Sequence, residues 1–306
     1  MPMKRPRKGE GKYEQSMTIR EFFTRFPDDE TCLQHIFECK FGQGHKCPKC
    51  ERDAKWYRIK AERAYSCQFC GHHLHPTVDT PFHRTRTPLQ LWFFAIYLFT
   101  TTRNGVSAKE LQRQLGVTYK TAWRMGHEIR KHMAYVAGDP TLASTVEVDE
   151  TYVGGKTTMD KKMDNKSVVF GMLQRDGRVT AKVVKDSSKN TLQPILKRNV
   201  KTGSTVYSDS YRSYRGLNRN GYVHGTVDHG KKEWERGHVH TNGIESFWSH
   251  LKKGLTSTHV SVSREHLEKY VKEFECRFNF RQNPKAMFPA LVSSFLRPEP
   301  STPKEP

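Results

Sequence analysis

Two pairs of cysteines constrain the fold of this chain more tightly than any other feature. Cys47 and Cys50 bound a CPKC sequence, and Cys67 and Cys70 bound a CQFC sequence sixteen residues later. Two tight turns of this kind can bring four thiolates around one tetrahedral Zn²⁺ ion, and the alternating residues between them favour strands. The spacing therefore predicts a zinc ribbon over residues 41–80, with coincidental CxxC pairs as the alternative.

The other cysteines fit a reducing compartment. The chain has seven cysteines, and its first residues lack the apolar segment of a secretory signal, so we expect a cytoplasmic protein without disulfides. Apolar neighbours predict that the remaining thiols are buried and structural; they are Cys32, Cys39 and Cys276. Three histidines follow the second cysteine pair and could replace a ligand, but the four cysteines already complete the site: His72, His73 and His75.

The charge balance favours a polyanionic partner. Lys and Arg number 52 against 32 Asp and Glu, a formal net charge of +20. Such an excess favours phosphate backbones and binding that weakens with salt, although a merely basic soluble protein would look the same by charge alone. The most apolar run, 89–99, has eleven residues and suits a buried helix, so we expect no membrane span.

Residues 105–133 have the pattern of a helix-turn-helix. Ser107 can cap a first helix, Gly116 lies at the turn, and a second helix begins near Tyr119. The expected packing face of the second helix is Ala122, Trp123, Met125 and Ile129. The expected DNA contacts are Tyr119, Lys120, Arg124 and His127. A helical hairpin without a role in DNA binding is the alternative.

After a turn-rich link at 138–144 the pattern changes to strands and helices. Strands are expected at 144–153, 167–174, 178–186, 204–209 and 222–229, with a hairpin at Asp176-Gly177. Helices are expected at 190–200, 210–220, 242–257 and 263–280, and a polar loop at 156–166. This order predicts a mixed sheet covered by helices, an α+β or α/β arrangement that matches the ribonuclease H-like fold.

The chain is accordingly divided into six parts. These are a basic flexible arm (1–15), a short helical segment (16–40), the zinc ribbon (41–80), a helical helix-turn-helix domain (81–137), a ribonuclease H-like domain (138–290) and a disordered tail (291–306).

Three carboxylates lie within the expected strands and helices of this pattern. Asp149 lies in the first strand of the expected sheet, Asp209 ends the fourth, and Glu245 opens a later helix. In the ribonuclease H-like arrangement the fourth strand lies beside the first, so these side chains can meet at one edge. Clustered carboxylates need a cation between them, and the usual solution is a pair of Mg²⁺ or Mn²⁺ ions for phosphoryl transfer. In so basic a chain the expected substrate is DNA.

Neighbouring polar residues leave the third ligand open. Asn242 precedes Glu245 by three residues, and Lys252 follows it by seven, so all three share one face of a helix. Glu245 is the better metal ligand by charge, and Lys252 is placed to hold a phosphate. Glu147 and Glu150 flank Asp149 and are expected on the opposite face of the strand. Trp248 fits either the core or stacking on a base; Asp228 and His240 are weaker candidates for metal and phosphate contacts.

At these residues the chain resembles the bacterial insertion-sequence transposases of the ISXO-like type, which are related to the Merlin transposons. The blocks that carry the resemblance are VEVDETYVGGK, VYSDSYRSY, HTNGIESFWSHLKKG and HLEKYVKEFECRFNFR, with CPKC…CQFC and LGVTYKTAWRM nearer the N-terminus. The resemblance implies an Asp-Asp-Glu or Asp-Asp-Asn catalytic set: Asp149, Asp209 and either Glu245 or Asn242.

The resemblance also implies a reaction and partners. Such an enzyme cleaves the phosphodiester at the end of its element, and the freed 3′-hydroxyl attacks target DNA. It binds double-stranded DNA at the terminal inverted repeats, works as a homodimer or larger homo-oligomer, and acts at the bacterial nucleoid. Two other readings remain: a metal-dependent nuclease of the same fold, and a DNA-binding regulator derived from an inactive transposase.

Overall fold

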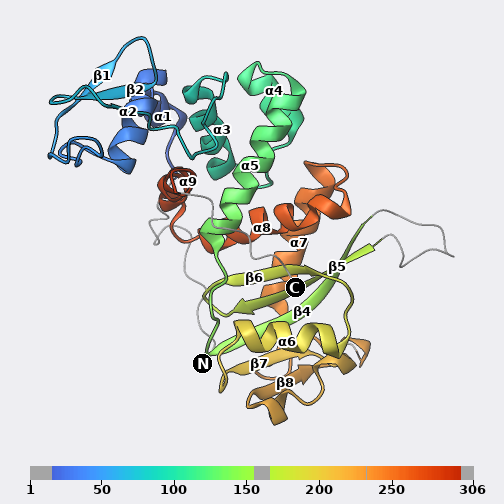
Figure 1. The fold of residues 1–306 in the computed structure, drawn as a ribbon. Helices are drawn as coiled ribbons and strands as arrows, with labels where there is room; N and C mark the ends of the chain where they lie inside the picture. Colours follow the sequence, from blue (N-terminus) through green and yellow to red (C-terminus); the bar gives the residue numbers. More distant parts are fainter. Residues whose placement is uncertain (1–15, 155–165, 232, 298–306) are drawn as a thin grey trace. The chain divides into compact units, whose positions relative to one another are not determined.

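The computed structural model describes residues 16–154, 166–231 and 233–297, which divide into two compact units (Figure 1). The ribbon unit takes 16–101, 111–132 and 283–297, and the sheet unit takes 102–110 and 133–282. The expected arm at 1–15 and most of the expected polar loop and tail lie outside the described residues. Within the described residues, no helix is both long and apolar enough to cross a membrane.

The ribbon unit combines helices with a small sheet. Its elements are α1 (Ile19–Arg25), α2 (Asp29–Lys40), β1 (Trp56–Ile59), β2 (Ala64–Cys67), β3 (His73–Leu74), α3 (Leu89–Thr101), η5 (Pro284–Ala286) and α9 (Met287–Phe295). Thr18 and Glu21 form a capping box at α1, and the Asp28 carboxylate caps α2 after the break at Pro27. The segment 291–306, expected to be a tail, therefore begins inside α9, where Phe295 is fully buried.

Two helices of the expected helix-turn-helix are present, α4 (Ala108–Leu115) and α5 (Tyr119–Ala137). The Ser107 hydroxyl accepts a hydrogen bond from the backbone N–H of Glu110, and Gly116 adopts the left-handed conformation at the turn (φ +63°). The packing face differs from expectation at Trp123. Its side chain is 39% exposed, whereas Ala122, Met125 and Ile129 are fully buried.

The sheet unit is built on five strands (Figure 1). They are β4 (Thr145–Gly154), β5 (Lys166–Gln174), β6 (Val179–Val184), β7 (Thr205–Asp209) and β8 (Val223–Val227). The spatial order is β6-β5-β4-β7-β8, with antiparallel pairing among β4, β5 and β6 and parallel pairing of β4 with β7 and of β7 with β8. The expected mixed sheet is confirmed, and β4 and β7 are neighbours in it.

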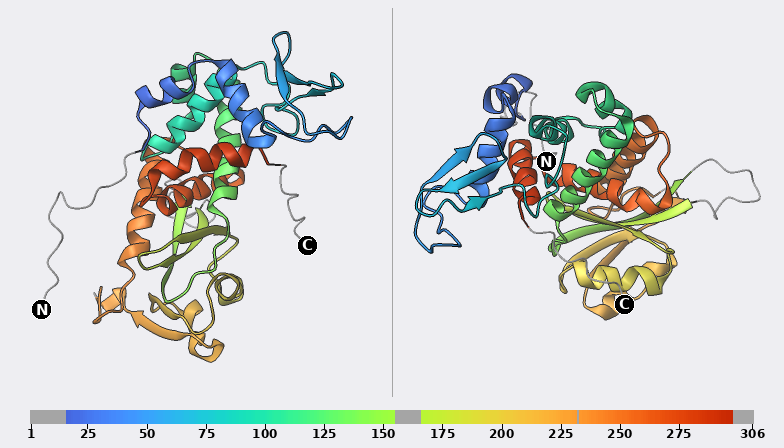
Figure 2. Two further views of the ribbon diagram at one scale, coloured as in Figure 1. Left: turned by 90° about the vertical axis from the view of Figure 1, so that its left-hand side faces the viewer. Right: turned by 45° about the horizontal axis from the view of Figure 1, so that its top comes forward.

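Helices cover both faces of this sheet (Figure 2). They are α6 (Lys189–Asn199), α7 (Asn242–Ser257) and α8 (Arg264–Asn279). Val146 and Val148 point toward α6, in an apolar cluster with Leu192 and Leu196. On the other face α7 and α8 form a second cluster with β5 and β6. Because side chains alternate along a strand, odd-numbered residues of β4 face α7, and even-numbered ones face α6.

Side chains of α8 accept hydrogen bonds from backbone N–H groups along the free edge of the sheet at β6. The backbone N–H groups of Ala181 and Val183 donate to the carboxylates of Glu275 (2.9 Å) and Glu268 (2.7 Å), and that of Val179 donates to the amide oxygen of Asn279 (2.8 Å). An unpaired edge is a template for pairing with another chain, so these contacts close the edge to further strands.

The segment 210–220 differs from the expected helix. It forms two short 3₁₀ helices, η2 (Arg212–Tyr214) and η3 (Leu217–Asn220), and a third, η4 (His229–Lys231), follows β8. Gly216 lies between η2 and η3 in a left-handed conformation (φ +88°). This conformation interrupts the helical backbone, so the segment cannot form one continuous helix.

Candidate functional site

The sheet places Asp149 and Asp209 on adjacent parallel strands. Glu147 of β4 lies opposite Tyr207 of β7, so two residues further along both strands Asp149 comes beside Asp209. Their charges interact: burial, then the charges of Glu150 and Asp209, raise the pKa of Asp149 to about 8. Burial also raises the pKa of Asp209. Two carboxylates so placed are hard to ionise together without a cation.

An indole fixes the orientation of Asp149. Trp248 of α7 is buried, and its Nε1–H donates a hydrogen bond to Oδ2 of Asp149 (3.0 Å), which opposes the rise in that pKa. Gly171 of β5 lies directly across from Asp149 and leaves the space for the indole. A Cβ atom at Gly171 would come within 2.5 Å of the Trp248 ring. Of the two alternatives for Trp248, the core and stacking on a base, the structure shows the core position, and the indole also contacts the candidate site.

Glu150 and Glu147 do not share a face, contrary to the expectation that both lie opposite Asp149. Glu150 faces α6, where the Tyr214 hydroxyl donates to it, and burial raises its pKa. The expectation is wrong for Glu147, because a residue two positions from Asp149 stays on the same side of the strand. Glu147 is 1% exposed and faces α7.

Glu147 joins the strand to the start of α7. Its Oε2 accepts a hydrogen bond from the backbone N–H of Ile244 (3.0 Å), and its Oε1 is 2.8 Å from Nε of Arg175 and 3.3 Å from Nδ1 of His240. The Arg175 guanidinium also donates to the carbonyls of His238 and His240. Gly243 permits this approach, since a Cβ atom there would lie 2.8 Å from Oε2. The contacts fix the segment that leads into α7.

Helix α7 carries the remaining candidates. Asn242 is its exposed first residue, and Lys252 is exposed further along. Oε1 of Glu245 accepts a hydrogen bond from the Thr241 hydroxyl (2.7 Å) and lies 3.3 Å from Nε2 of His229. Against the effect of burial, the charge of His229 lowers the pKa of Asp209, so this histidine interacts with both carboxylates.

The three carboxylates do not form a closed ligand set. Taken together, the described residues Asp149, Asp209 and Glu245 do not have all their ligand oxygens within 4.8 Å of one another. Oδ1 of Asp209 accepts a hydrogen bond from the backbone N–H of Tyr211 (3.0 Å), while Glu245 is directed to Thr241 and His229. Glu245 is 39% exposed, so its side chain has room to turn.

The four cysteines of the ribbon meet as the spacing predicts. All four sulfur atoms lie within 4.8 Å of one another, with 3.6 Å between Cys47 and Cys70 and 3.9 Å between Cys50 and Cys67. Tetrahedral Zn²⁺ with bonds of about 2.3 Å places sulfurs about 3.8 Å apart, so the set fits this ion. Burial opposes ionisation of Cys47, but hydrogen bonds from the backbone N–H groups of Cys50 and Lys49 lower its pKa to about 7.

The other thiols are free. Cys32 and Cys276 are buried as expected, and burial raises the pKa of each to about 12, whereas Cys39 is exposed. These high pKa values leave both buried thiols protonated and unreactive.

The candidate DNA contacts at the start of α5 differ in exposure. Tyr119, Lys120 and Arg124 are exposed. His127 is not, contrary to expectation: it is 7% exposed, and its ring centroid lies 4.0 Å from that of Trp123. Trp123 therefore occupies the surface position and covers the histidine.

Sequence reasoning missed His229 and Arg175 of the sheet unit. His229 lies in a 3₁₀ turn and Arg175 at a hairpin, so neither falls in a periodic pattern that would mark it. Arg175 follows β5 directly, where a surface cation is unremarkable; only its three contacts with Glu147 and residues 238–240 distinguish it.

Comparisons with known proteins cover both units. Residues 141–279 match the family described as the ISXO2-like transposase domain, and residues 27–73 match the transposase zinc-ribbon domain. The chain is 25% identical over 293 residues to an uncharacterized protein in transposable element ISH50 of Halobacterium salinarum, covering 89% of this chain and 98% of that protein. It is 37% identical over 102 residues to an uncharacterized transposase-like protein of Haemophilus influenzae, covering 33% of this chain and 81% of that protein. With these matches over the sheet and the ribbon, the chain belongs to the ISXO2-like transposases of insertion sequences.

Proposed function

We propose that the sheet unit is a ribonuclease H-like catalytic domain that cleaves the ends of a transposable element and joins the freed 3′-hydroxyl to target DNA. The observation that carries the proposal is the pairing of β4 with β7, which brings Asp149 beside Asp209 under a helix that carries Glu245. The strand order β6-β5-β4-β7-β8, in which the first and fourth strands of the unit are neighbours, supports the assignment of the fold.

Asp149, Asp209 and Glu245 are the residues that would hold Mg²⁺ or Mn²⁺, with Asn242 as the alternative third ligand. Their carboxylate oxygens are the donors that these ions prefer. Burial raises the pKa of both aspartates, and the charges of Glu150 and Asp209 raise that of Asp149 further, so a bound cation would favour the ionised carboxylates. When bound, the ions neutralise charge on the phosphodiester and activate the attacking oxygen.

The protein groups around these ligands hold them and the DNA. Trp248 orients Asp149 through Nε1–H, and Glu147 and Arg175 fix the start of α7. His229 lies 3.3 Å from Glu245 and orients its carboxylate. The exposed ammonium of Lys252 lies on the same helix as Glu245 and is assigned to a phosphate of the cleaved strand.

DNA recognition is assigned to α4 and α5, with α5 as the helix that enters the major groove. Tyr119, Lys120 and Arg124 are exposed at its N-terminal end, where such helices contact base edges. His127 is excluded from this role by its burial. The exposed cations Lys46, Lys49 and Arg52 add a phosphate-binding surface on the zinc ribbon. Joining two element ends requires at least two copies of the chain, so the active form is a homodimer or larger assembly at the bacterial nucleoid.

The test uses the full chain, Mg²⁺ and labelled DNA ending in the inverted repeats that flank its own gene. Nicked ends and strand-transfer products are expected with the unaltered protein, and neither product with Asp149→Ala or Asp209→Ala, while DNA binding persists. Glu245→Ala and Asn242→Ala in parallel identify the third ligand. Ser257→Ala, which alters the exposed last residue of α7, is the matched control and should retain full activity.

Two outcomes would overturn the proposal in different ways. Cleavage without strand transfer would identify a nuclease of the same fold. Tight, specific DNA binding without cleavage, unchanged by Asp149→Ala, would identify a regulator.

A further inference from the structure

Three metal-ligating side chains outside the four cysteines meet on the small sheet of the ribbon unit. They are Glu62, in the turn between β1 and β2, and His73 and His75, in and just after β3. One ligand atom from each lies within 4.8 Å of the other two. Nδ1 of His73 is 3.8 Å from Oε2 of Glu62, and the two imidazole centroids are 6.4 Å apart.

The pairing of the strands explains why these residues converge. In the antiparallel pair of β2 and β3, Ser66 lies opposite His73 and Tyr65 opposite Leu74. One further step brings His75 opposite Ala64, beside the turn that holds Glu62. Leu74 is buried between two exposed histidines, so His73 and His75 project from the same outer face. The pairing of the strands thus places two imidazoles close to one carboxylate.

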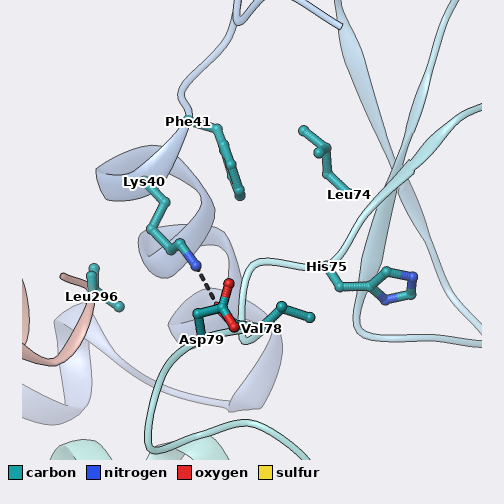
Figure 3. Close-up of a pocket in the computed structure, with 7 residues that line it drawn as sticks. All are labelled: Lys40, Phe41, Leu74, His75, Val78, Asp79 and Leu296. Carbon is teal, nitrogen blue, oxygen red and sulfur yellow. Dashed lines mark hydrogen bonds between the residues drawn. The ribbon is translucent and has the colours of Figure 1, made fainter. Parts of the chain in front are cut away.

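The backbone after β3 is anchored by hydrogen bonds within the ribbon unit. A cavity of about 430 Å³ lies beside it, and Lys40, Phe41, Leu74 and His75 itself are among the residues that line it (Figure 3). The backbone N–H of Val78 donates to the carbonyl of His75 (3.1 Å), and the Lys40 ammonium donates to the carbonyl of Val78 (2.6 Å). Figure 3 shows the His75 imidazole turned away from Lys40 and Asp79. The backbone of His75 is therefore held while its ring stays accessible.

We propose that Glu62, His73 and His75 form a second Zn²⁺ site, separate from the four cysteines, with a fourth position open to water. Two imidazoles and one carboxylate are a ligand set that Zn²⁺ accepts in three-ligand sites, with bonds of about 2.0–2.2 Å. Tetrahedral geometry places such donors about 3.3 Å apart. Rotation of exposed side chains closes the remaining distance, because all three residues are exposed. The inference does not depend on the proposed catalytic activity.

The two zinc sites would hold opposite ends of one sheet. The thiolates gather where β2 ends at Cys67, whereas Glu62 lies in the turn before β2 begins at Ala64. A metal bound by Glu62, His73 and His75 would tie the first hairpin to the third strand. That third strand is only two residues long, so it has few backbone hydrogen bonds of its own.

The test measures zinc in the purified full chain by elemental analysis and by competition titration with a chromophoric chelator. The expected result is two zinc ions per chain, one of them removed more readily. His73→Ala, His75→Ala and Glu62→Gln should each reduce the content to one. His83→Ala, which removes another exposed histidine of the same segment outside the cluster, should leave two.

Replacement of zinc by Co²⁺ separates the two sites by their spectra. Thiolate-to-metal charge-transfer absorption reports the cysteine site and should be the same in every variant, which also shows that the ribbon has folded. Co²⁺ at the second site adds d–d absorption without this charge transfer, and His75→Ala should remove it. One zinc per chain in the unaltered protein, at free zinc that saturates the cysteines, would overturn the proposal. So would two zinc ions in all three variants.

Discussion

The thiolates of the ribbon come from residues 47–70, whereas the candidate catalytic carboxylates come from residues 149–245. The first set is held by two tight turns and a sheet of very short strands, so its geometry depends on the ion. The second set is carried by a sheet with an apolar cluster on each face, so the backbone that carries it is held without any ion. Under the proposed function, metal is part of the fold in the ribbon and takes part in the reaction at the sheet.

Zinc removal is the largest effect expected from this difference. Structural zinc sites supply on the order of 10–16 kcal/mol of apparent binding free energy, and a strong chelator or Cys50→Ser removes that contribution. Residues 41–80 should then lose protection from hydrogen exchange, while the five-stranded sheet keeps its own. Addition of Mg²⁺ with the chelator controls for loss of that ion. Simultaneous unfolding of both regions would show that the sheet also depends on zinc.

The next effect concerns the ion pair of the buried Glu147 with Arg175, whose side chain is 24% exposed. Glu147→Ala leaves the Arg175 guanidinium without its carboxylate and the N–H of Ile244 without its acceptor. Removal of one partner from a fully buried pair costs about 3–5 kcal/mol, and the partial exposure of Arg175 places the expected loss at the lower end, about 3 kcal/mol. The free energy of unfolding in urea, measured on the full chain, should fall by this amount.

The control is Lys182→Met, which removes a more exposed pair. Nζ of Lys182 is 3.1 Å from Oδ2 of Asp139, whose side chain is 58% exposed. Such pairs contribute roughly 0–1 kcal/mol. An equal loss in both variants would refute the buried character of Glu147.

The third prediction concerns the pH dependence of stability without divalent ions. The folded protein keeps the proton of Asp149 up to a pKa of about 8, whereas the unfolded chain releases it near 3.8. The folded state thus binds more protons between these values, so this group lowers stability as the pH rises from 4 to 8. Asp149→Asn lacks this titration and should be more stable than the unaltered chain at pH 8, by about 2–4 kcal/mol.

Urea unfolding of both proteins across this pH range provides the measurement. The difference should vanish near pH 4 and shrink when Mg²⁺ is added at pH 8. A difference independent of pH would mean that Asp149 is ionised normally in the folded protein.

The smallest change in stability is expected at Trp248. Trp248→Phe removes the Nε1–H that holds Asp149 but keeps an aromatic ring in the cluster, so stability should fall by about 1 kcal/mol. The rate of strand transfer should fall roughly 10–100-fold, as for other groups that orient metal ligands. DNA affinity, measured by fluorescence anisotropy, should not change. A variant with normal rates would show that Asp149 needs no orientation by the indole.

The sequence predicted local features better than distant contacts. The cysteine spacing and the strand that ends at Asp209 are local patterns, and the structure agrees with both: the four sulfurs meet, and β7 ends at Asp209. Glu147 lies on the same face of β4 as Asp149, as the period of two along a strand requires, and the expectation of the opposite face is wrong. Trp123 and His127 lie four residues apart on one helical face, and periodicity alone does not tell which is covered. The contact of His229 with Glu245 joins a short 3₁₀ turn to helix α7. It depends on the tertiary placement of that turn, which no periodic sequence pattern indicates.

The first turn of α7 is stabilised by a hydrogen bond to a residue of β4. Thr241, at the position before the helix, makes no side-chain capping bond, and the N–H of Ile244 is instead satisfied by Glu147 from a strand far earlier in the chain. A negative charge there also favours the helix dipole. The start of the helix thus depends on a residue 97 positions earlier in the chain. A fragment that lacks β4 would leave this N–H without its acceptor, and the turn that carries the candidate ligands Asn242 and Glu245 would be held less firmly.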